Sequence, residues 1–191
     1  MEKSIHIIYV SGLGDGHDGL RRFCLRLWRY KHVTTELVSM AWADGKSYDE
    51  KYERLSKAID DAAGKRIVLI GESAGGSMVV NMYAARASDL YKVLTICGKN
   101  QGMHGVSPRY YQKNPAFRES MYATEKSIAS LSKSQLREFI SVTPLFDPTV
   151  PIADTLLPGC QHVKLFAAGH FIPITLALTI YSWKIVRLVK V

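Results

Sequence analysis

Gly71-Glu72-Ser73-Ala74-Gly75 is a G-x-S-x-G pentapeptide that lies between two segments of different character. Residues 65–70 before it form a short, β-branched apolar run that predicts a buried strand. Residues 76–86 after it predict a helix. A serine at such a sharp turn keeps its hydroxyl exposed, and glycines on both sides avoid a clash between a Cβ atom and the neighbouring elements. The pattern predicts that Ser73 is a nucleophile beside the free N–H groups of a helix start.

An acid and a histidine follow this serine along the chain. The apolar run over 139–146 leads into Asp147 and a proline-rich turn, and a strand predicted at 162–168 leads into Gly169-His170. The carboxyl ends of parallel strands meet at one edge of a sheet, where such folds place their sites. We therefore predict a catalytic triad in which His170 takes the proton of Ser73 and Asp147 fixes the tautomer of the imidazole.

Other residues compete for these roles. Asp154 is an alternative acid, but it follows the proline-rich turn and not the end of the predicted strand. None of the other histidines follows the acid at the carboxyl end of a predicted strand. They are His6, His17, His32, His104 and His162.

These motifs resemble the α/β-hydrolase superfamily, in its small, carboxylesterase-like form. Residues 71–76 are similar to the nucleophile elbow of carboxylesterases and lipases, residues 147–151 resemble the Asp-x-x-Val-Pro turn around the acid, and Gly169-His170 resembles the Gly-His ending. The order of serine, acid and histidine is the order of that fold. The resemblance runs from the first strand to the last helix and is loosest in the middle third. It implies a serine hydrolase that forms an acyl-enzyme on Ser73, with a carboxylic ester as the commonest substrate.

An oxyanion hole needs two backbone N–H groups. The resemblance assigns one to Ala74, directly after the nucleophile. It assigns the other to Leu13, in the glycine-rich loop at 11–19 after the first strand. Where the family often has His-Gly in this loop, the chain has Ser11-Gly12. Gly12 and His17 are further candidates for contact with substrate.

The same loop allows two other interpretations. A dinucleotide fingerprint, G-x-G-x-x-G, would require glycine at the position of His17, and no Walker lysine pattern is present. Asp15, His17 and Asp18 resemble a metal cluster only superficially, because no second set of ligands follows at suitable spacing. We predict neither a cofactor nor a metal.

The order of predicted elements indicates an α/β fold. Strands are expected at 4–10, 33–39, 65–70, 92–98, 139–146 and 162–168, and helices at 18–30, 48–63 and 76–86, with a final helix after 170. In the first helix, Leu20, Phe23, Cys24, Leu27 and Trp28 are expected on one inward face. This alternation predicts a three-layer αβα sandwich with a doubly wound, mostly parallel, six-stranded sheet. It is a minimal α/β-hydrolase core, without the two strands that usually precede the oxyanion strand.

The chain is expected to form one domain, 1–191, with a cap insertion at 99–138. Helices are predicted at 115–131 and 133–139. Tyr110, Tyr111 and Tyr122 either line an acyl pocket for apolar groups or pack the cap onto the sheet. In the second case the pocket would be formed by the loop at 11–19 and the residues around Phe146 and Phe171.

Composition and the terminal segments indicate the compartment and the partners of the protein. The three cysteines, Cys24, Cys97 and Cys160, are scattered, which favours free thiols in a reducing compartment. Met1-Glu2-Lys3 leads directly into a strand, so we expect no signal peptide and a cytoplasmic protein. The apolar run over 172–183 is too short to span a bilayer. The net charge of +8 would attract anionic partners, but no nucleic-acid motif accompanies it.

Three functions therefore remain open at the level of sequence. The first is a serine hydrolase acting on a small ester. The second is an acyltransferase or thioesterase that uses the same triad. The third is a noncatalytic ligand- or partner-binding protein on the same fold. The oligomeric state is not predicted.

Overall fold

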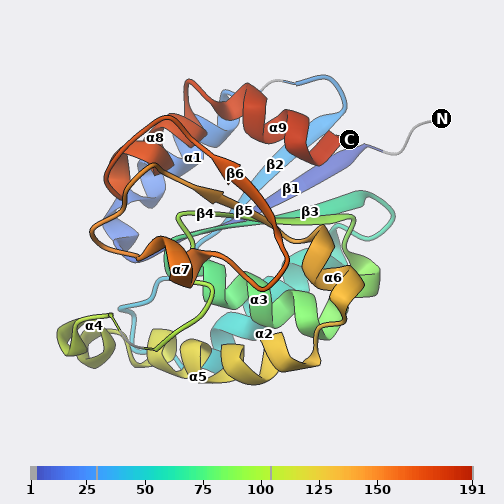
Figure 1. The fold of residues 1–191 in the computed structure, drawn as a ribbon. Helices are drawn as coiled ribbons and strands as arrows, with labels where there is room; N and C mark the ends of the chain where they lie inside the picture. Colours follow the sequence, from blue (N-terminus) through green and yellow to red (C-terminus); the bar gives the residue numbers. More distant parts are fainter. Residues whose placement is uncertain (1–3, 29, 104, 191) are drawn as a thin grey trace.

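The computed structural model describes residues 4–28, 30–103 and 105–190 (Figure 1). Its centre is a six-stranded sheet with the order β2-β1-β3-β4-β5-β6, and every pair of neighbouring strands is parallel. The strands are β1 (Ile5–Val10), β2 (Val33–Val38), β3 (Arg66–Glu72), β4 (Lys92–Ile96), β5 (Ile140–Thr143) and β6 (Gln161–Lys164). The chain adds β2 on one side of β1 and the later strands on the other, so the predicted doubly wound sheet is confirmed.

Helices cover both faces of this sheet. The helices are α1 (Asp18–Arg26), α2 (Tyr48–Asp61), α3 (Gly75–Arg86), α4 (Pro108–Lys113), α5 (Pro115–Ser130), α6 (Lys133–Glu138), α7 (Ile152–Thr155), α8 (Phe171–Leu178) and α9 (Ser182–Lys190), with short 3₁₀ turns η1 (Asp15–His17) and η2 (Ala87–Asp89). Figure 1 shows α1, α8 and α9 on one face and α2, α3, α5 and α6 on the other. The predicted three-layer sandwich is confirmed.

The central strands are buried on both faces. Ile8 and Leu69 point into the core beneath α2, α3 and α5, whereas Ile7 and Val68 point into the core beneath α1, α8 and α9. A parallel sheet covered on both sides needs apolar residues at nearly every strand position. This is why the central strands β1, β3 and β4 appear as nearly continuous apolar runs in the sequence.

The first helix differs from its prediction in which face it buries. Cys24 and Trp28 point inward, together with Leu25. Leu20, Phe23 and Leu27, which were expected on the same inward face, are each more than half exposed. The helix is in contact with β2, which selects a face centred on Cys24 and Leu25. The expected inward position of Leu20, Phe23 and Leu27 is therefore wrong.

Two strands end earlier than predicted. β5 ends at Thr143, because Pro144 has no N–H to donate to the sheet. β6 ends at Lys164. Beyond these ends, two backbone hydrogen bonds still join the segments: Leu145 N donates to Ala167 O (2.8 Å), and Gly169 N donates to Phe146 O (2.8 Å). This irregular pairing brings the next residues of both segments side by side.

The insertion at 99–138 divides into two parts. α5 packs along α3 and α2 and belongs to one helix layer of the sandwich. The Ser120 and Ser77 hydroxyls share a 2.8 Å hydrogen bond across this contact. The loop before α4, α4 itself and Phe117 near the start of α5 line a cavity beside Ser73, and residue 104 lies outside the described residues. The helices predicted at 115–131 and 133–139 correspond to α5 and α6.

The final helix is two helices. α8 and α9 are separated by a break at 179–181, where Thr179 leaves the helical conformation and Tyr181 N donates back to Leu176 O (2.7 Å). Among the described helices, none alone has the length and apolar character to cross a membrane. α8 and α9 reach that length only when they are taken together, and a bend of 70° separates them.

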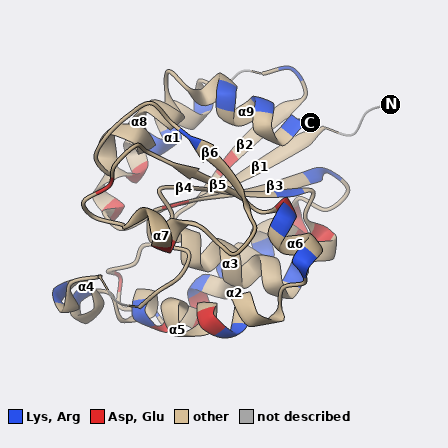
Figure 2. Cartoon of the chain, viewed as in Figure 1, with Lys and Arg blue, Asp and Glu red and all other residues tan. Residues whose placement is uncertain are grey.

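Charged side chains are unevenly spread over the two helix layers. Figure 2 shows acidic and basic residues mixed on α2, α5 and α6. It shows basic but no acidic residues on α9, and neither kind on α8.

Candidate active site

Ser73 lies in a tight turn between β3 and α3. Its φ of 49° falls in the left-handed region, which a residue with a Cβ rarely adopts. A Cβ on Gly71 would lie 2.7 Å from the carbonyl oxygen of Gly75, and one on Gly75 would lie 2.5 Å from that of Val10. The turn therefore requires both glycines of the pentapeptide and leaves the serine side chain pointing off the sheet edge.

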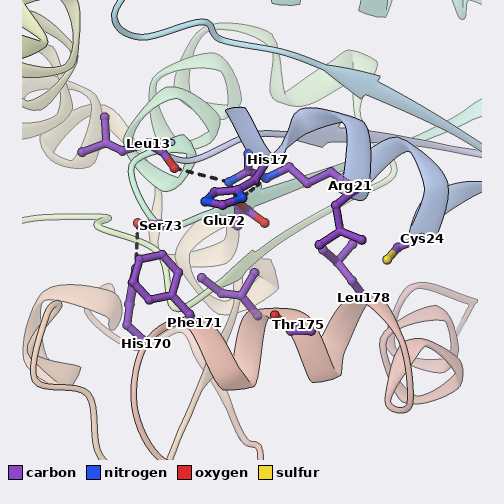
Figure 3. A pocket seen from close by; sticks show the side chains of 12 residues that line it. Leu13, His17, Arg21, Cys24, Glu72, Ser73, His170, Phe171, Thr175 and Leu178 are labelled. Atoms are coloured by element: carbon purple, nitrogen blue, oxygen red, sulfur yellow. Dashed lines mark hydrogen bonds and ion pairs between the residues drawn. The ribbon is translucent and has the colours of Figure 1, made fainter. Parts of the chain in front are cut away.

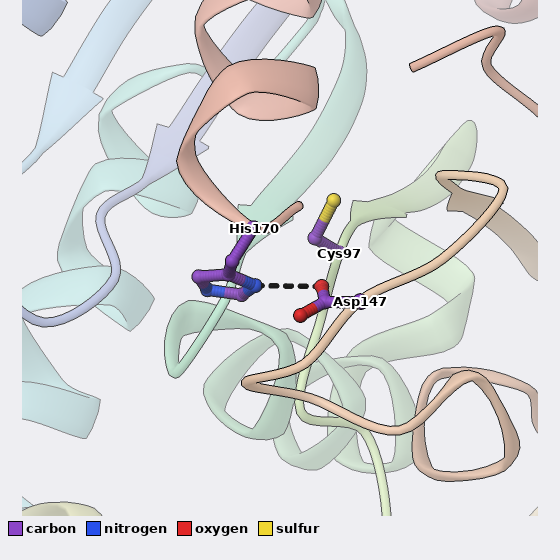
Figure 4. A group of neighbouring side chains, drawn as sticks. All are labelled: Cys97, Asp147 and His170. Atoms are coloured by element: carbon purple, nitrogen blue, oxygen red, sulfur yellow. Dashed lines mark hydrogen bonds and ion pairs between the residues drawn. The ribbon is translucent and has the colours of Figure 1, made fainter. Parts of the chain in front are cut away.

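The structure brings Ser73, His170 and Asp147 into one chain of hydrogen bonds. His170 Nε2 lies 2.8 Å from Ser73 Oγ, and His170 Nδ1 lies 2.7 Å from Asp147 Oδ2 (Figures 3 and 4). In this arrangement the serine hydroxyl donates to Nε2, and the Nδ1–H donates to the carboxylate. His170 and Asp147 are buried, whereas Ser73 is partly exposed. A substrate carbonyl can reach the serine oxygen, and bulk water has little access to the other two groups.

The surroundings of Asp147 favour its ionised form. Burial by itself would raise the pKa of this carboxyl group. Hydrogen bonds from His170 and from the backbone N–H groups of Val150 and Thr149 outweigh burial and hold the pKa below its ordinary value. Asp147 is therefore a carboxylate at neutral pH, and the turn after it fixes its orientation.

The alternative acid, Asp154, has a different partner. It lies on α7 and forms an ion pair with Lys99, and its backbone oxygen accepts from the N–H groups of Asn100 and Gln101. The structure thus joins His170 to Asp147 and not to Asp154.

Among the other described histidines, His17 is the one that borders the site. His6 is hydrogen-bonded to Thr34, and His162 to Thr143. His17 lines a cavity at the site, and His104 lies outside the described residues.

The proposed oxyanion loop packs directly against Ser73. A Cβ on Gly12 would lie only 2.8 Å from Ser73 Cβ, so only glycine allows this approach. Within the described chain, the backbone N–H groups of Leu13 and Ala74 donate to no other residue. Both groups remain available to a substrate oxygen on Ser73.

A buried ion pair that sequence reasoning missed holds this loop. Glu72 is 1% exposed and accepts hydrogen bonds from Tyr9 OH (2.6 Å), Arg21 Nε (2.7 Å) and Gly12 N (3.3 Å). The Arg21 guanidinium also donates to the carbonyls of Gly14 (3.0 Å) and Leu13 (3.3 Å). A buried ion pair is tolerated when its remaining hydrogen bonds are satisfied, as they are here. The pair ties the loop to the residue before Ser73.

The sequence contained only a weak signal for this pair. Glu72 is a charged residue in the turn beside Ser73, and Arg21 is one of several arginines that lie close together in the sequence. In the structure Arg21 is buried, which its neighbours in the sequence do not indicate.

Two cavities open on either side of Ser73 and His170. The first, about 350 Å³, lies between η1, α1 and α8 (Figure 3). Its apolar lining includes Leu20, Cys24, Ile174 and Leu178. The second, about 330 Å³, lies between the loop at 105–107, α4 and the turn after Asp147. Both are of a size that suits small-molecule sites, and both are bordered by Leu13 and Phe171.

The three tyrosines of the insertion separate in space. Tyr110 lines the second cavity. Tyr111 packs on Phe117, with ring centroids 5.4 Å apart, and its hydroxyl donates to Met103 O. Tyr122 projects into solvent from α5, which lies along α3. Tyr111 and Tyr122 line neither cavity, so the structure does not bring these two predicted substrate residues to the site.

Cys97, which the sequence analysis describes only as a free thiol, is a neighbour of Asp147 and His170. It is buried, and its Sγ, an Asp147 oxygen and a His170 ring nitrogen all lie within 4.8 Å of one another (Figure 4). Burial, together with the nearby Asp147, raises the pKa of the Cys97 thiol well above its ordinary value. These three atoms form a possible metal-ligand set. However, a protonated thiol and a shared Asp147–His170 hydrogen bond suit a triad better than a ligand set. Of the other two cysteines, Cys24 is buried and Cys160 is partly buried, and all three are free thiols.

Comparisons with known proteins identify the fold. No protein-family model matches the sequence. No curated protein sequence matches it either. Among solved structures, an enol-lactonase from Burkholderia xenovorans LB400 matches with a TM-score of 0.64 and 14% identity, over 98% of this chain and 92% of that chain.

Two further structures extend this likeness. A monoacylglycerol lipase from Paleococcus ferrophilus matches with a TM-score of 0.63 and 12% identity, over 99% of this chain and 96% of that chain. MGS-MChE2, an α/β hydrolase from a lagoon-sediment metagenome, matches with a TM-score of 0.59 and 14% identity, over 97% and 93%. The chain therefore has the α/β-hydrolase fold.

Proposed function

We propose that this protein is a serine hydrolase that cleaves small carboxylic esters through an acyl-enzyme on Ser73. The observation that carries the proposal is the continuous hydrogen-bond chain from Ser73 Oγ through His170 to Asp147. Lipases, esterases and a lactonase among the structural neighbours support an ester as the substrate.

The geometry accounts for each step of acyl transfer. As Ser73 Oγ attacks the ester carbonyl, His170 Nε2 takes its proton, and Asp147 stabilises the imidazolium that forms. The N–H groups of Leu13 and Ala74 donate to the oxyanion. When the tetrahedral intermediate collapses, His170 gives the proton to the leaving alcohol. Water then attacks the acyl-enzyme with His170 as base and releases the acid and free Ser73.

Each of the two cavities would hold one part of the ester substrate. The first is lined by Leu20, Ile174 and Leu178 and suits an apolar acyl chain. The second includes Lys99, Thr149 and Tyr110 and suits the more polar alcohol group. The ester bond lies where the cavities meet, at Ser73 and His170.

A labelling experiment tests the proposal. Purified protein should react with a fluorophosphonate at Ser73 and should hydrolyse p-nitrophenyl esters. A panel of increasing acyl length would define the first cavity. A folded protein that neither labels nor hydrolyses would instead be a noncatalytic binding protein. Labelling with transfer of the acyl group to an acceptor other than water would indicate an acyltransferase.

Replacing Tyr110 by alanine is expected to change which alcohol group the protein prefers. Removing a side chain that lines the second cavity should shift the ratio of kcat/KM between small and bulky alcohols by about tenfold. Tyr122→Ala is the matched control, because Tyr122 and Tyr110 have similar exposure (57% and 50%) and only Tyr110 lines a cavity. Tyr111→Ala should lower the melting temperature without changing the ratio. Equal shifts in all three variants would contradict the assignment of the second cavity.

Replacing Glu72 by glutamine is expected to lower kcat by about 10- to 100-fold with a smaller change in KM, because a weakened pair with Arg21 loosens the oxyanion loop. The control is Asp44→Asn, which weakens the Lys51–Asp44 pair (2.5 Å). That variant should lose stability but not kcat. If both variants lower the melting temperature and neither lowers kcat, the Glu72–Arg21 pair is structural only.

A further inference from the structure

The helix α1 carries apolar side chains on two faces. Its inner face packs on the sheet. A second stripe, formed by Leu20, Phe23 and Leu27, follows the i, i+3, i+7 spacing of a helix, and each of these side chains is 57–59% exposed. A helix that covers a sheet normally turns polar residues outward. An outward apolar stripe therefore indicates a second contact surface.

The neighbouring helices extend this stripe. α8 lies beside α1, where Trp28 Nε1 donates to Leu178 O (2.8 Å), and Tyr30 shares a hydrogen bond with Ser182 (2.9 Å) at the start of α9. Four large apolar residues of the α8–α9 segment are also at least half exposed. We call the seven exposed apolar residues of this helix layer the apolar patch: Leu20, Phe23, Leu27, Phe171, Ile172, Ile180 and Trp183.

The charge around the apolar patch is positive. The sequence has no aspartate or glutamate between positions 19 and 35, and none after Asp154. Within the described parts of α1, α8 and α9, the one acidic residue is Asp18, which is paired with Arg21. The exposed basic residues of these helices are Arg22, Arg26, Lys184, Arg187 and Lys190.

The opposite helix layer, formed by α2, α3, α5 and α6, has a different balance of acidic and basic residues. Its exposed acidic residues are Asp49, Glu50, Glu53, Asp60, Asp61, Asp89, Glu119, Glu125 and Glu138. Exposed basic residues of that layer, such as Lys57, Arg118 and Lys126, are interspersed with these acidic residues, so the excess of positive charge lies on the side of the molecule that carries the apolar patch (Figure 2).

We propose that the outer surface of α1, α8 and α9 binds anionic lipid membranes. Apolar side chains would enter the interface, and the surrounding arginines and lysines would pair with lipid headgroups, each favouring binding. Trp183 has the amphipathic ring typical of such interfaces, and Lys184 Nζ lies 5.5 Å from its centroid. A second copy of this chain fits less well, because it would bring a face with the same positive charge.

The surface also opens onto the site. Leu20 and Phe171 belong to the apolar patch and line the first cavity. A membrane bound here would place its acyl chains at the mouth of that cavity, next to Ser73. The proposal of membrane binding depends only on the exposed residues of α1, α8 and α9. The delivery of lipid esters to Ser73 depends in addition on the proposed function.

Vesicle co-sedimentation of the full chain tests the proposal. We expect binding to phosphatidylcholine vesicles that contain phosphatidylglycerol, and much weaker binding to phosphatidylcholine alone or at high salt. Arg22→Gln combined with Arg26→Gln should weaken binding by about 30-fold, since each basic residue near the surface contributes a factor of about five. Phe23→Ser combined with Leu27→Ser should weaken it by at least about tenfold.

Matched variants on the opposite layer provide the control. Tyr122→Ser and Lys126→Gln, both on α5, replace an exposed ring and an exposed base and should leave binding unchanged. Circular dichroism and melting temperatures verify that each variant is folded. Equal sedimentation of wild type and the α1 variants would overturn the proposal, as would self-association through the apolar patch without vesicle binding.

Labelling of Ser73, measured in the same preparations, separates this inference from the proposed function. Vesicle binding without labelling overturns the proposed function alone. Labelling without vesicle binding overturns the membrane surface alone.

Discussion

Replacing Ser73 by alanine is expected to abolish ester hydrolysis and fluorophosphonate labelling while the fold is kept. Alanine removes the attacking oxygen, and its Cβ occupies the same left-handed turn as that of serine, at φ 49°. His170→Ala should lower kcat/KM by about 10³-fold or more, because the members of a triad act as a unit. Turnover of p-nitrophenyl esters, with circular dichroism on the same samples, measures both effects.

Two conservative variants serve as controls. Ser88→Ala removes an exposed hydroxyl in η2, and His162→Ala removes an imidazole that is hydrogen-bonded to Thr143. Both should retain nearly full turnover. Substantial hydrolysis by the Ser73 or His170 variant would refute the assignment of these residues as nucleophile and base.

Replacing Asp147 by asparagine should slow turnover by roughly 10³- to 10⁴-fold, because the amide no longer selects the tautomer in which His170 Nε2 is the base. Asp154→Asn should leave kcat nearly unchanged, although losing the ion pair with Lys99 should lower the melting temperature. The opposite result, a large loss of kcat in the Asp154 variant alone, would transfer the role of acid to Asp154.

The pH dependence of stability gives a second readout for Asp147. Its pKa in the folded state lies below the ordinary value. The carboxylate therefore stabilises the fold above the ordinary aspartate pKa, and this contribution is lost as the pH falls through the lowered value. Asp147→Asn should flatten that part of the stability curve.

The sheet was predictable because burial on both faces leaves a simple pattern. The run over 65–70 and the run over 92–98 contain apolar residues at successive positions, and both form central strands. The glycine requirement of the turn around Ser73 is equally local, since Gly71 and Gly75 meet atoms of adjacent elements. These features depend on short stretches of chain, and a sequence displays them directly.

Features that depend on packing between distant segments were not predictable. Tyr122 was misplaced because the contacts of α5 with α3 decide which face of α5 is buried. Phe23 was misplaced because the contacts of α1 with the sheet decide which face of α1 is buried. The Arg21–Glu72 pair joins residues 51 positions apart, and the sequence around either residue does not indicate which residue is its partner. The end of β5 was placed too late because the apolar run continues past Pro144.

The position of β6 at the edge of the sheet makes the part of the site that holds His170 easier to unfold locally than the part that holds Ser73. Ser73 follows β3, in the interior of the sheet, whereas His170 follows β6, a four-residue strand that lies next to β5 at the edge of the described sheet. Short edge elements open locally at a lower free energy than the centre of a domain. Fraying of this margin would withdraw the imidazole from Ser73 while the interior stays folded. On heating or in mild denaturant, esterase activity would then be lost before the circular dichroism of the whole domain changes.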